Sequence, residues 1–214
     1  MKGLLRNNLY GTLSNAKVFA GFMILFGIFG VAVISQSVQI SYVMIGSIGF
    51  SLSAIIVAKN EFATKWGKYK LTLPVRRADI VKSQFLNQVI WLPVGTFFVG
   101  IELGLSWLFH GCPFDQDIDV LTLFALGISM NLFMGAIFFP LFYAGGEERG
   151  EMFWMIAILC AFGIDCTIVT VLNELLEPGP TTVVLGAVIL IVCSLFAFAI
   201  SYPVTVSIFE RKEY

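Results

Sequence analysis

Two acidic side chains stand inside long apolar stretches of this sequence, where a carboxylate can bind a cation or carry a proton. Glu102 lies in the last third of the stretch 84–109. Asp165 lies in the stretch 152–172, about 21 Å from Glu151 if each helical residue rises 1.5 Å. An ionised carboxylate near the centre of a bilayer costs about 2.5–3.5 kcal/mol, so it normally faces protein or water. Neither stretch contains a basic residue that could pair with its carboxylate.

Each carboxylate therefore has two interpretations. It could meet a cationic group of a transported molecule or exchange a proton, or it could hydrogen-bond to a neighbouring Ser, Thr, Asn or backbone group. For Glu102, close to the membrane surface, we favour the structural interpretation, and for Asp165 both stay open. Asn131, in the stretch 120–144, is better explained by a packing hydrogen bond than by ligand binding.

Other chemistries lack the residues that they need. The sequence has no GxxxxGK[ST] phosphate loop, so ATP hydrolysis would have to reside on another polypeptide. His110 is the only histidine, which excludes a metal site with several histidine ligands and gives a Ser-His-Asp triad little support. The acidic connection 145–151 lacks the EExxxR spacing of membrane-embedded CAAX-type proteases. We expect a chain that is not an enzyme and holds no metal or cofactor of its own.

Six apolar stretches must position these residues. They cover residues 18–35, 40–58, 84–109, 120–144, 152–172 and 182–206. The chain is 58% hydrophobic and 13% charged, whereas a soluble domain carries about 25% charged residues. About 20 apolar residues suffice for a helix to cross a hydrocarbon core of about 30 Å. We predict an all-α integral membrane protein, a single domain over 1–214 with six transmembrane helices.

The basic residues indicate how these helices are oriented. All thirteen lysines and arginines fall in alternate connections between the stretches: Lys2, Arg6 and Lys17, then Lys59, Lys65, Lys68, Lys70, Arg76, Arg77 and Lys82, then Arg149, and finally Arg211 and Lys212. Because connections rich in Lys and Arg stay in the cytoplasm, the pattern predicts a multi-pass protein of the cell membrane with both termini inside.

Two of these basic segments have further patterns. In 1–17, Leu5, Leu9 and Leu13 repeat at intervals of four, which predicts an amphipathic helix lying on the inner membrane surface. The connection 59–83 carries seven basic and two acidic residues, a net charge of +5. Its aromatic residues Phe62, Trp66 and Tyr69 share one face of a short helix, which Pro74 then ends. That helix could rest on lipid headgroups or dock a cytoplasmic partner.

A resemblance favours docking. The run Glu61, Lys65, Trp66, Lys68, Tyr69, Leu71, Thr72, Leu73, Pro74, Val75, Arg76, Arg77, Ile80, Val81 and Lys82 resembles the connection after the second helix in ABC-2 type transporter permeases. It is most similar to that of the small six-helix permeases that export peptides or confer resistance to antimicrobial peptides. The six spans and the N-terminal segment extend the resemblance over the whole chain.

The resemblance implies partners and roles. In such permeases this connection is a coupling helix that sits in a cleft of an ATP-binding cassette subunit, which binds ATP and Mg. The contact residues implied here are Glu61, Phe62, Lys65, Trp66, Lys68 and Tyr69. A second permease subunit, identical or related, would complete the exporter, and the cargo would be an amphipathic or cationic peptide or an antimicrobial compound. The alternatives are an ATP-independent membrane scaffold or immunity protein that sequesters a peptide, and a proton-coupled transporter that uses Asp165.

Overall fold

The computed structural model describes residues 2–32, 35–63, 76–111, 114, 117–146, 149–177 and 179–211. Six helices follow one another within this part of the chain: α1 (Lys2–Ala32), α2 (Gln36–Ala63), α4 (Arg77–His110), α5 (Asp117–Gly145), α6 (Gly150–Leu175) and α7 (Pro180–Arg211). Each is long and apolar enough to cross a membrane. The prediction of an all-α protein with six membrane-spanning helices is confirmed.

Local sequence explains where these helices continue and where one of them ends. A bilayer offers the backbone no hydrogen-bond partners, so a spanning segment has to be helical throughout. Pro93, Pro140 and Pro203 stand inside α4, α5 and α7 without ending them, as neighbouring helices permit in a membrane protein. Helix α4 ends where Gly111 adopts φ +81°, a conformation that glycine takes without steric cost.

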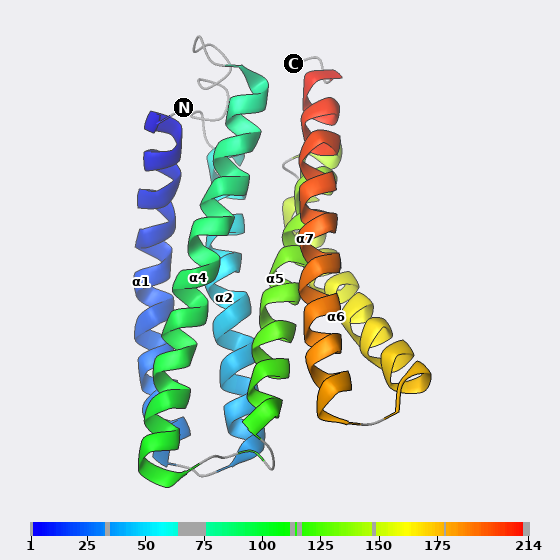
Figure 1. The fold of residues 1–214 in the computed structure, drawn as a ribbon. Helices are drawn as coiled ribbons and strands as arrows, with labels where there is room; N and C mark the ends of the chain where they lie inside the picture. Colours follow the sequence, from blue (N-terminus) through cyan, green and yellow to red (C-terminus); the bar gives the residue numbers. More distant parts are fainter. Residues whose placement is uncertain are drawn as a thin grey trace.

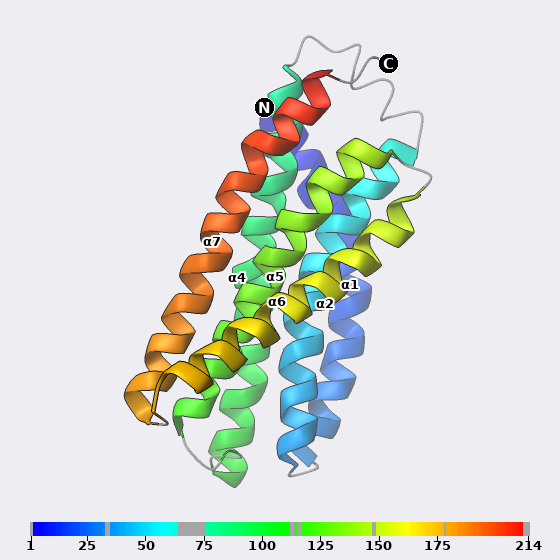
Figure 2. The ribbon, with the colours of Figure 1, turned by 90° about the vertical axis from the view of Figure 1, so that its right-hand side faces the viewer.

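The helices form a bundle in which α5 is central. Helices α1, α2 and α4 pack together, and α5 lies against α2, α4, α6 and α7. Figure 1 shows α1, α2 and α4 on one side and α5, α6 and α7 on the other. Helix α6 crosses α5 obliquely (Figure 2), and its last turns lean away from the other helices (Figure 1). Both termini lie at the same end of the bundle.

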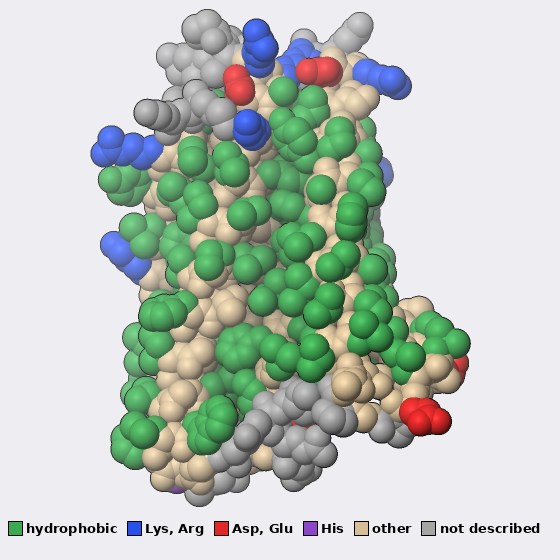
Figure 3. Space-filling view, viewed as in Figure 1, with side chains coloured by type: hydrophobic (Ala, Val, Ile, Leu, Met, Phe, Trp, Pro, Cys, Tyr) green, Lys and Arg blue, Asp and Glu red, His purple; other side chains and the backbone are tan. Residues whose placement is uncertain are grey.

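Charge differs between the two ends of the bundle. Lys and Arg side chains gather at the end where the chain begins and finishes (Figure 3). We call this the basic end, and its described residues include Lys59, Arg77, Arg149 and Arg211. The opposite or far end carries the acidic and histidine residues Asp119, Glu174, Glu177 and His110. The alternation of basic residues along the sequence thus places most of them at one end of the bundle. Lys17 stands about 22 Å along α1 from Lys2, and acidic residues such as Glu151 also occur at the basic end.

Aromatic side chains fill the core of the basic half. Phe85 of α4 packs against Phe139 of α5 and Phe198 of α7, with ring centroids 4.4 and 4.9 Å away. Tyr143 of α5 meets Phe209 of α7 edge to face at 4.8 Å. Such aromatic pairs contribute about 0.5–1.5 kcal/mol each beyond the area that they bury. This cluster joins α4, α5 and α7 near the basic end.

The N-terminal segment differs from its expected form. Helix α1 runs without interruption through the predicted interfacial segment 1–17 into the first span. Its buried face is not that of Leu5, Leu9 and Leu13 but the one formed by Leu4, Asn8, Thr12 and Ala16. The physical reason is that α4 offers polar partners to Asn8 and Thr12, so the segment packs upright along the bundle.

Candidate functional site

The N-terminal half of α1 is joined to α4 by a polar seam. The Asn8 amide lies 3.1 Å from the Ser83 hydroxyl, and Asn87 Nδ2 donates to Thr12 Oγ1 at 2.9 Å. All four side chains are buried. A buried polar group left unpaired costs about 1–3 kcal/mol, so these pairs fix the register of α1 against α4.

The same seam reaches the predicted ATPase contact Glu61. Asn7 Nδ2 donates to Glu61 Oε1 at 2.7 Å, and Glu61 is only 8% exposed. With the amide of Asn8 turned to satisfy its neighbours, its nitrogen also donates to Glu61 Oε1 at 2.9 Å. Glu61 therefore ties the end of α2 to the start of α1. Phe62 lies in the next position of α2. The predicted contacts Lys65, Trp66, Lys68 and Tyr69 lie outside the described residues.

On the other side of the connection 64–75, Arg77 holds the end of α7. Its Nη1 donates to the carbonyl oxygens of Phe209 at 3.0 Å and Glu210 at 3.2 Å. The guanidinium also lies over the Phe209 ring, 5.6 Å from its centroid. A cation bound to the last carbonyls of a helix is favourable because they form the negative end of its dipole. Both ends of the connection are thus fastened to other helices.

An ion pair adds a third contact at the basic end. Lys59 Nζ of α2 lies 2.8 Å from Glu151 Oε1 in the first turn of α6. Glu151 is largely exposed, and surface ion pairs of this kind contribute little to stability. The pair nevertheless places the start of α6 beside the end of α2.

At mid-depth, Asn131 of α5 joins three helices. Its Oδ1 accepts from Ser51 Oγ of α2 at 2.6 Å, and its Nδ2 donates to the Ser47 carbonyl at 3.2 Å. Gln88 Nε2 of α4 donates to the Asn131 carbonyl at 2.9 Å. The prediction that Asn131 makes packing hydrogen bonds is confirmed. Gly135, one turn further along α5, leaves room for the Gln88 amide, which a Cβ at that position would overlap.

Asp165 has a partner within the protein. It is 4% exposed, and Ser129 Oγ of α5 donates to its Oδ1 at 2.9 Å. Asp165 also borders a cavity of about 230 Å³ with Met44, Phe162 and Cys166. The hydrogen bond matches the structural interpretation for this residue, while a role in transport stays a prediction.

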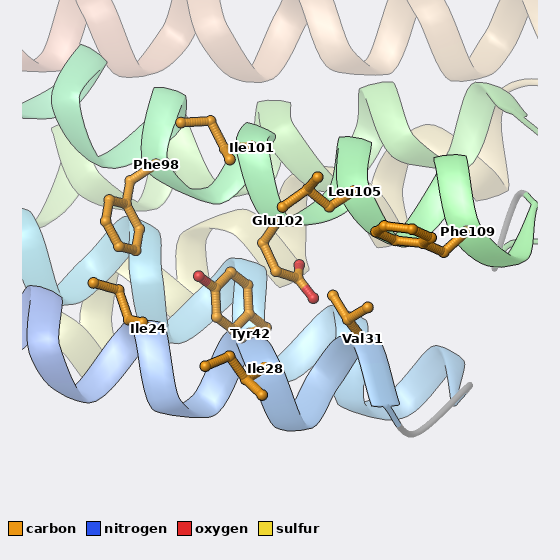
Figure 4. A pocket seen from close by; sticks show the side chains of 10 residues that line it. Ile24, Ile28, Val31, Tyr42, Phe98, Ile101, Glu102, Leu105 and Phe109 are labelled. Atoms are coloured by element: carbon orange, nitrogen blue, oxygen red, sulfur yellow. The ribbon is translucent and has the colours of Figure 1, made fainter.

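Glu102 is different although it is equally buried. It is 5% exposed, and no well-formed hydrogen bond reaches either carboxylate oxygen among the described residues. The polar group beside it is the Gln39 amide, whose nitrogen donates to the Gly30 carbonyl oxygen at 3.1 Å and to Ser106 Oγ at 3.0 Å. The interpretation favoured from the sequence, a hydrogen-bonded Glu102, therefore stays open with Gln39 as its candidate partner. The side chain projects from α4 toward α1 into an apolar cavity of about 380 Å³. Figure 4 shows its carboxylate beside the Tyr42 ring and the side chain of Val31.

Sequence reasoning missed the polar stripe of α4. Ser83, Gln84, Asn87 and Gln88 are all buried, and Tyr143 Oη donates to Gln84 Oε1 at 2.7 Å. The signal was present, because these four residues lie three or four apart or adjacent, and Glu102 and Ser106, four apart, follow 14 residues after Gln88. A polar face at helical spacing inside an apolar helix predicts contact with other helices rather than with lipid.

Comparison with known proteins identifies the family. A family model described as "ABC-2 family transporter protein" matches residues 3–210, almost the whole chain. No curated protein and no solved structure matches the sequence. The match extends from the polar seam at the start of α1 to the end of α7 that Arg77 holds, and it includes the buried Glu102 and Asp165. The chain belongs to the ABC-2 family of transporter proteins and is a multi-pass membrane component of transport.

Proposed function

We propose that this protein is the permease subunit of an ATP-binding cassette exporter, and that its basic end faces the cytoplasm. Membership of the ABC-2 family and the concentration of Lys and Arg at one end support this proposal. ATP and Mg would be bound by a separate ATPase subunit that docks on the connection 64–75.

The observation that carries the proposal is the way in which both ends of this connection are fastened. Glu61 precedes it and is bound by Asn7 of α1, whereas Arg77 follows it and holds the last carbonyls of α7. A partner that displaced the connection would pull on the first and the last helix together. Hydrogen bonds that involve a charged group contribute about 1.5–3 kcal/mol each, enough to carry such a displacement.

The proposed cargo is an amphipathic or cationic peptide, or an antimicrobial compound, moved out of the cell or membrane. The carboxylate of Glu102, buried beside an apolar cavity, supports a cationic, apolar cargo. A second permease subunit would contribute helices to the path. Helices α1, α6 and α7 bury little of their surface within this chain, so they are the faces available to such a subunit.

The test is co-expression and co-purification with a candidate ATP-binding cassette subunit from the same organism. The wild-type chain is expected to bring down that subunit with ATPase activity, and the double variant Trp66→Ala plus Tyr69→Ala is expected to lose it. The matched control is Phe97→Ala plus Trp107→Ala, which removes two exposed aromatic side chains from the membrane face of α4. A well-folded wild-type chain that recruits no ATPase would contradict the proposal.

A further inference from the structure

We propose that the cavity between α1 and α4 binds a single-chain amphiphile with a cationic head, which enters from the membrane and pairs with Glu102. As a cargo site this inference rests on the export function proposed above. The binding itself is a property of this chain alone and needs no ATPase.

The first argument is the missing counter-charge. Glu102 is 95% buried, no well-formed hydrogen bond reaches its oxygens among the described residues, and the polar group beside it, the Gln39 amide, is neutral. The sequence contains no Lys or Arg in 18–58 or in 83–148, which include the far halves of the helices around it. Leaving a buried charge without a partner is strongly destabilising. An external ammonium group would supply the missing charge.

The second argument is the shape of the wall opposite the carboxylate. Gly27 and Gly30 of α1 face Glu102, and a Cβ at Gly30 would lie 2.9 Å from Glu102 Oε1. A Cβ at Gly27 would lie 3.3 Å from Glu102 Cγ. Because Gly27 and Gly30 have no side chains, the Glu102 side chain fits against α1, and larger residues at these two positions would displace it.

The third argument is the remainder of the cavity, which is apolar and open to lipid. It runs along α1 from Ile24 to Val31, about 10 Å at 1.5 Å per residue. Ile28 is 64% exposed and Leu105 is 44% exposed, so the cavity borders the membrane side of the bundle. Its volume of about 380 Å³ lies near the lower limit of ligand pockets, about 300–1,000 Å³. That volume suits one alkyl chain rather than the two chains of a bilayer lipid.

The direction of the cavity fits an amphiphile in one leaflet. Glu102 lies two to three helical turns before the far end of α4 at His110, and Phe98 lies one turn deeper. Figure 4 shows Phe98 and Ile24 on one side of the carboxylate and Phe109 on the other. A head at Glu102 would therefore sit close to the membrane surface while its chain pointed toward the middle of the bilayer.

The experiment measures binding of radiolabelled dodecyltrimethylammonium to the purified full chain in phosphatidylglycerol nanodiscs, with binding to empty nanodiscs subtracted. We expect saturable binding that Glu102→Gln weakens at least tenfold. Asp165→Asn is the matched control, because it neutralises another buried carboxylate, which borders a separate cavity, and it should bind as wild type does. Unlabelled dodecyltrimethylammonium should compete, and dodecyl sulfate, which has the same chain with an anionic head, should not.

A second variant protects the test against misfolding. Leu105→Trp adds bulk to the cavity without replacing the carboxylate. Leu105 is 44% exposed at the cavity rim, so the larger ring can occupy the cavity mouth without forcing the helices apart. It should also weaken binding at least tenfold. Equal affinity in wild type and both variants would overturn the proposal. Displacement of the probe by phosphatidylethanolamine included in the nanodiscs would also overturn it, because a two-chain amine lipid would then be the occupant.

The outcome is separable from the fate of the proposed function. If the chain binds the probe through Glu102 but recruits no ATPase, the amphiphile site is supported and the proposed exporter function is contradicted. If the chain recruits the ATPase but Glu102 does not affect probe binding, the exporter function is supported and the amphiphile site is contradicted.

Discussion

The basic half and the far half of the bundle are held together in different ways. In the basic half, polar side chains join helices that are distant in sequence, as Asn7 does with Glu61 and Tyr143 with Gln84. The far half has fewer such bonds, among them Gln39 with Ser106 and Ser129 with Asp165. Cavities open there beside Glu102 and Asp165, and α6 leans away from the bundle. A densely bonded region resists rearrangement, whereas a loosely packed one allows it at low free energy. The basic half, where the proposed ATPase would dock, is therefore the stiffer one. The far half, where cargo would bind, can change conformation more easily.

The largest expected effect on stability comes from placing a larger side chain in the closely packed basic half. Gly135→Leu should destabilise the protein by about 3 kcal/mol, because the new side chain overlaps the buried Gln88 amide. Thermal unfolding in detergent, followed by size-exclusion chromatography, measures the loss. Gly163→Leu on α6 is the control, since a Cβ there meets nothing within 4 Å. Equal losses in the two variants would mean that the halves do not differ in packing.

A more local effect is expected from Arg77→Ala. Loss of the hydrogen bonds to Phe209 and Glu210 should loosen the end of α7. At about 1.5–3 kcal/mol for bonds to a charged group, hydrogen exchange of amides in 205–211 should accelerate about tenfold to a hundredfold. Exchange measured by mass spectrometry tests this. The control Arg6→Ala removes an exposed arginine that contacts Tyr10 on its own helix. Unchanged protection in Arg77→Ala would assign the stiffness of α7 to aromatic packing alone.

The smallest effect is expected from Asp165→Asn. The amide oxygen of asparagine can still accept the hydrogen bond from Ser129, so stability should change by no more than about 1 kcal/mol. Thermal unfolding measures stability, and transport assays with and without a proton gradient test function. If this variant folds but abolishes a proton-dependent transport, the charge of Asp165 is used in the mechanism. The contrast between a structural Asp165 and a ligand-binding Glu102 would then fail.

The course of the chain through the membrane was predictable from sequence. Apolar length identifies the segments that a bilayer accepts, and each of the six appears as a helix. Hydropathy does not say how a segment outside the hydrocarbon lies. The leucines of 1–17 suggested a helix flat on the membrane, yet Asn8 and Thr12 find partners on α4 about 75 residues away, and the segment stands upright.

The candidate site was predictable only in part. Glu102 and Asp165 were both identifiable as unusual, because carboxylates are rare inside spans. What distinguishes them is Ser129, which is 36 residues from Asp165 in the sequence and lies beside it only in the folded bundle. The burial of Glu61 against Asn7 likewise depends on a contact across 54 residues. The predicted coupling contacts from Lys65 to Tyr69 stay predictions.

The length of α4 has a mechanical consequence. Its 34 residues make a rod of about 51 Å at 1.5 Å per residue, whereas the hydrocarbon core is about 30 Å thick. Tilting such a rod by about 10° around its middle would move each tip by about 4 Å. A helix that overhangs the bilayer is also sensitive to its thickness, because a thicker membrane favours the upright position and a thinner one favours tilt. Lipid composition would thereby shift the tilt of α4, the same motion that a docked ATPase would drive.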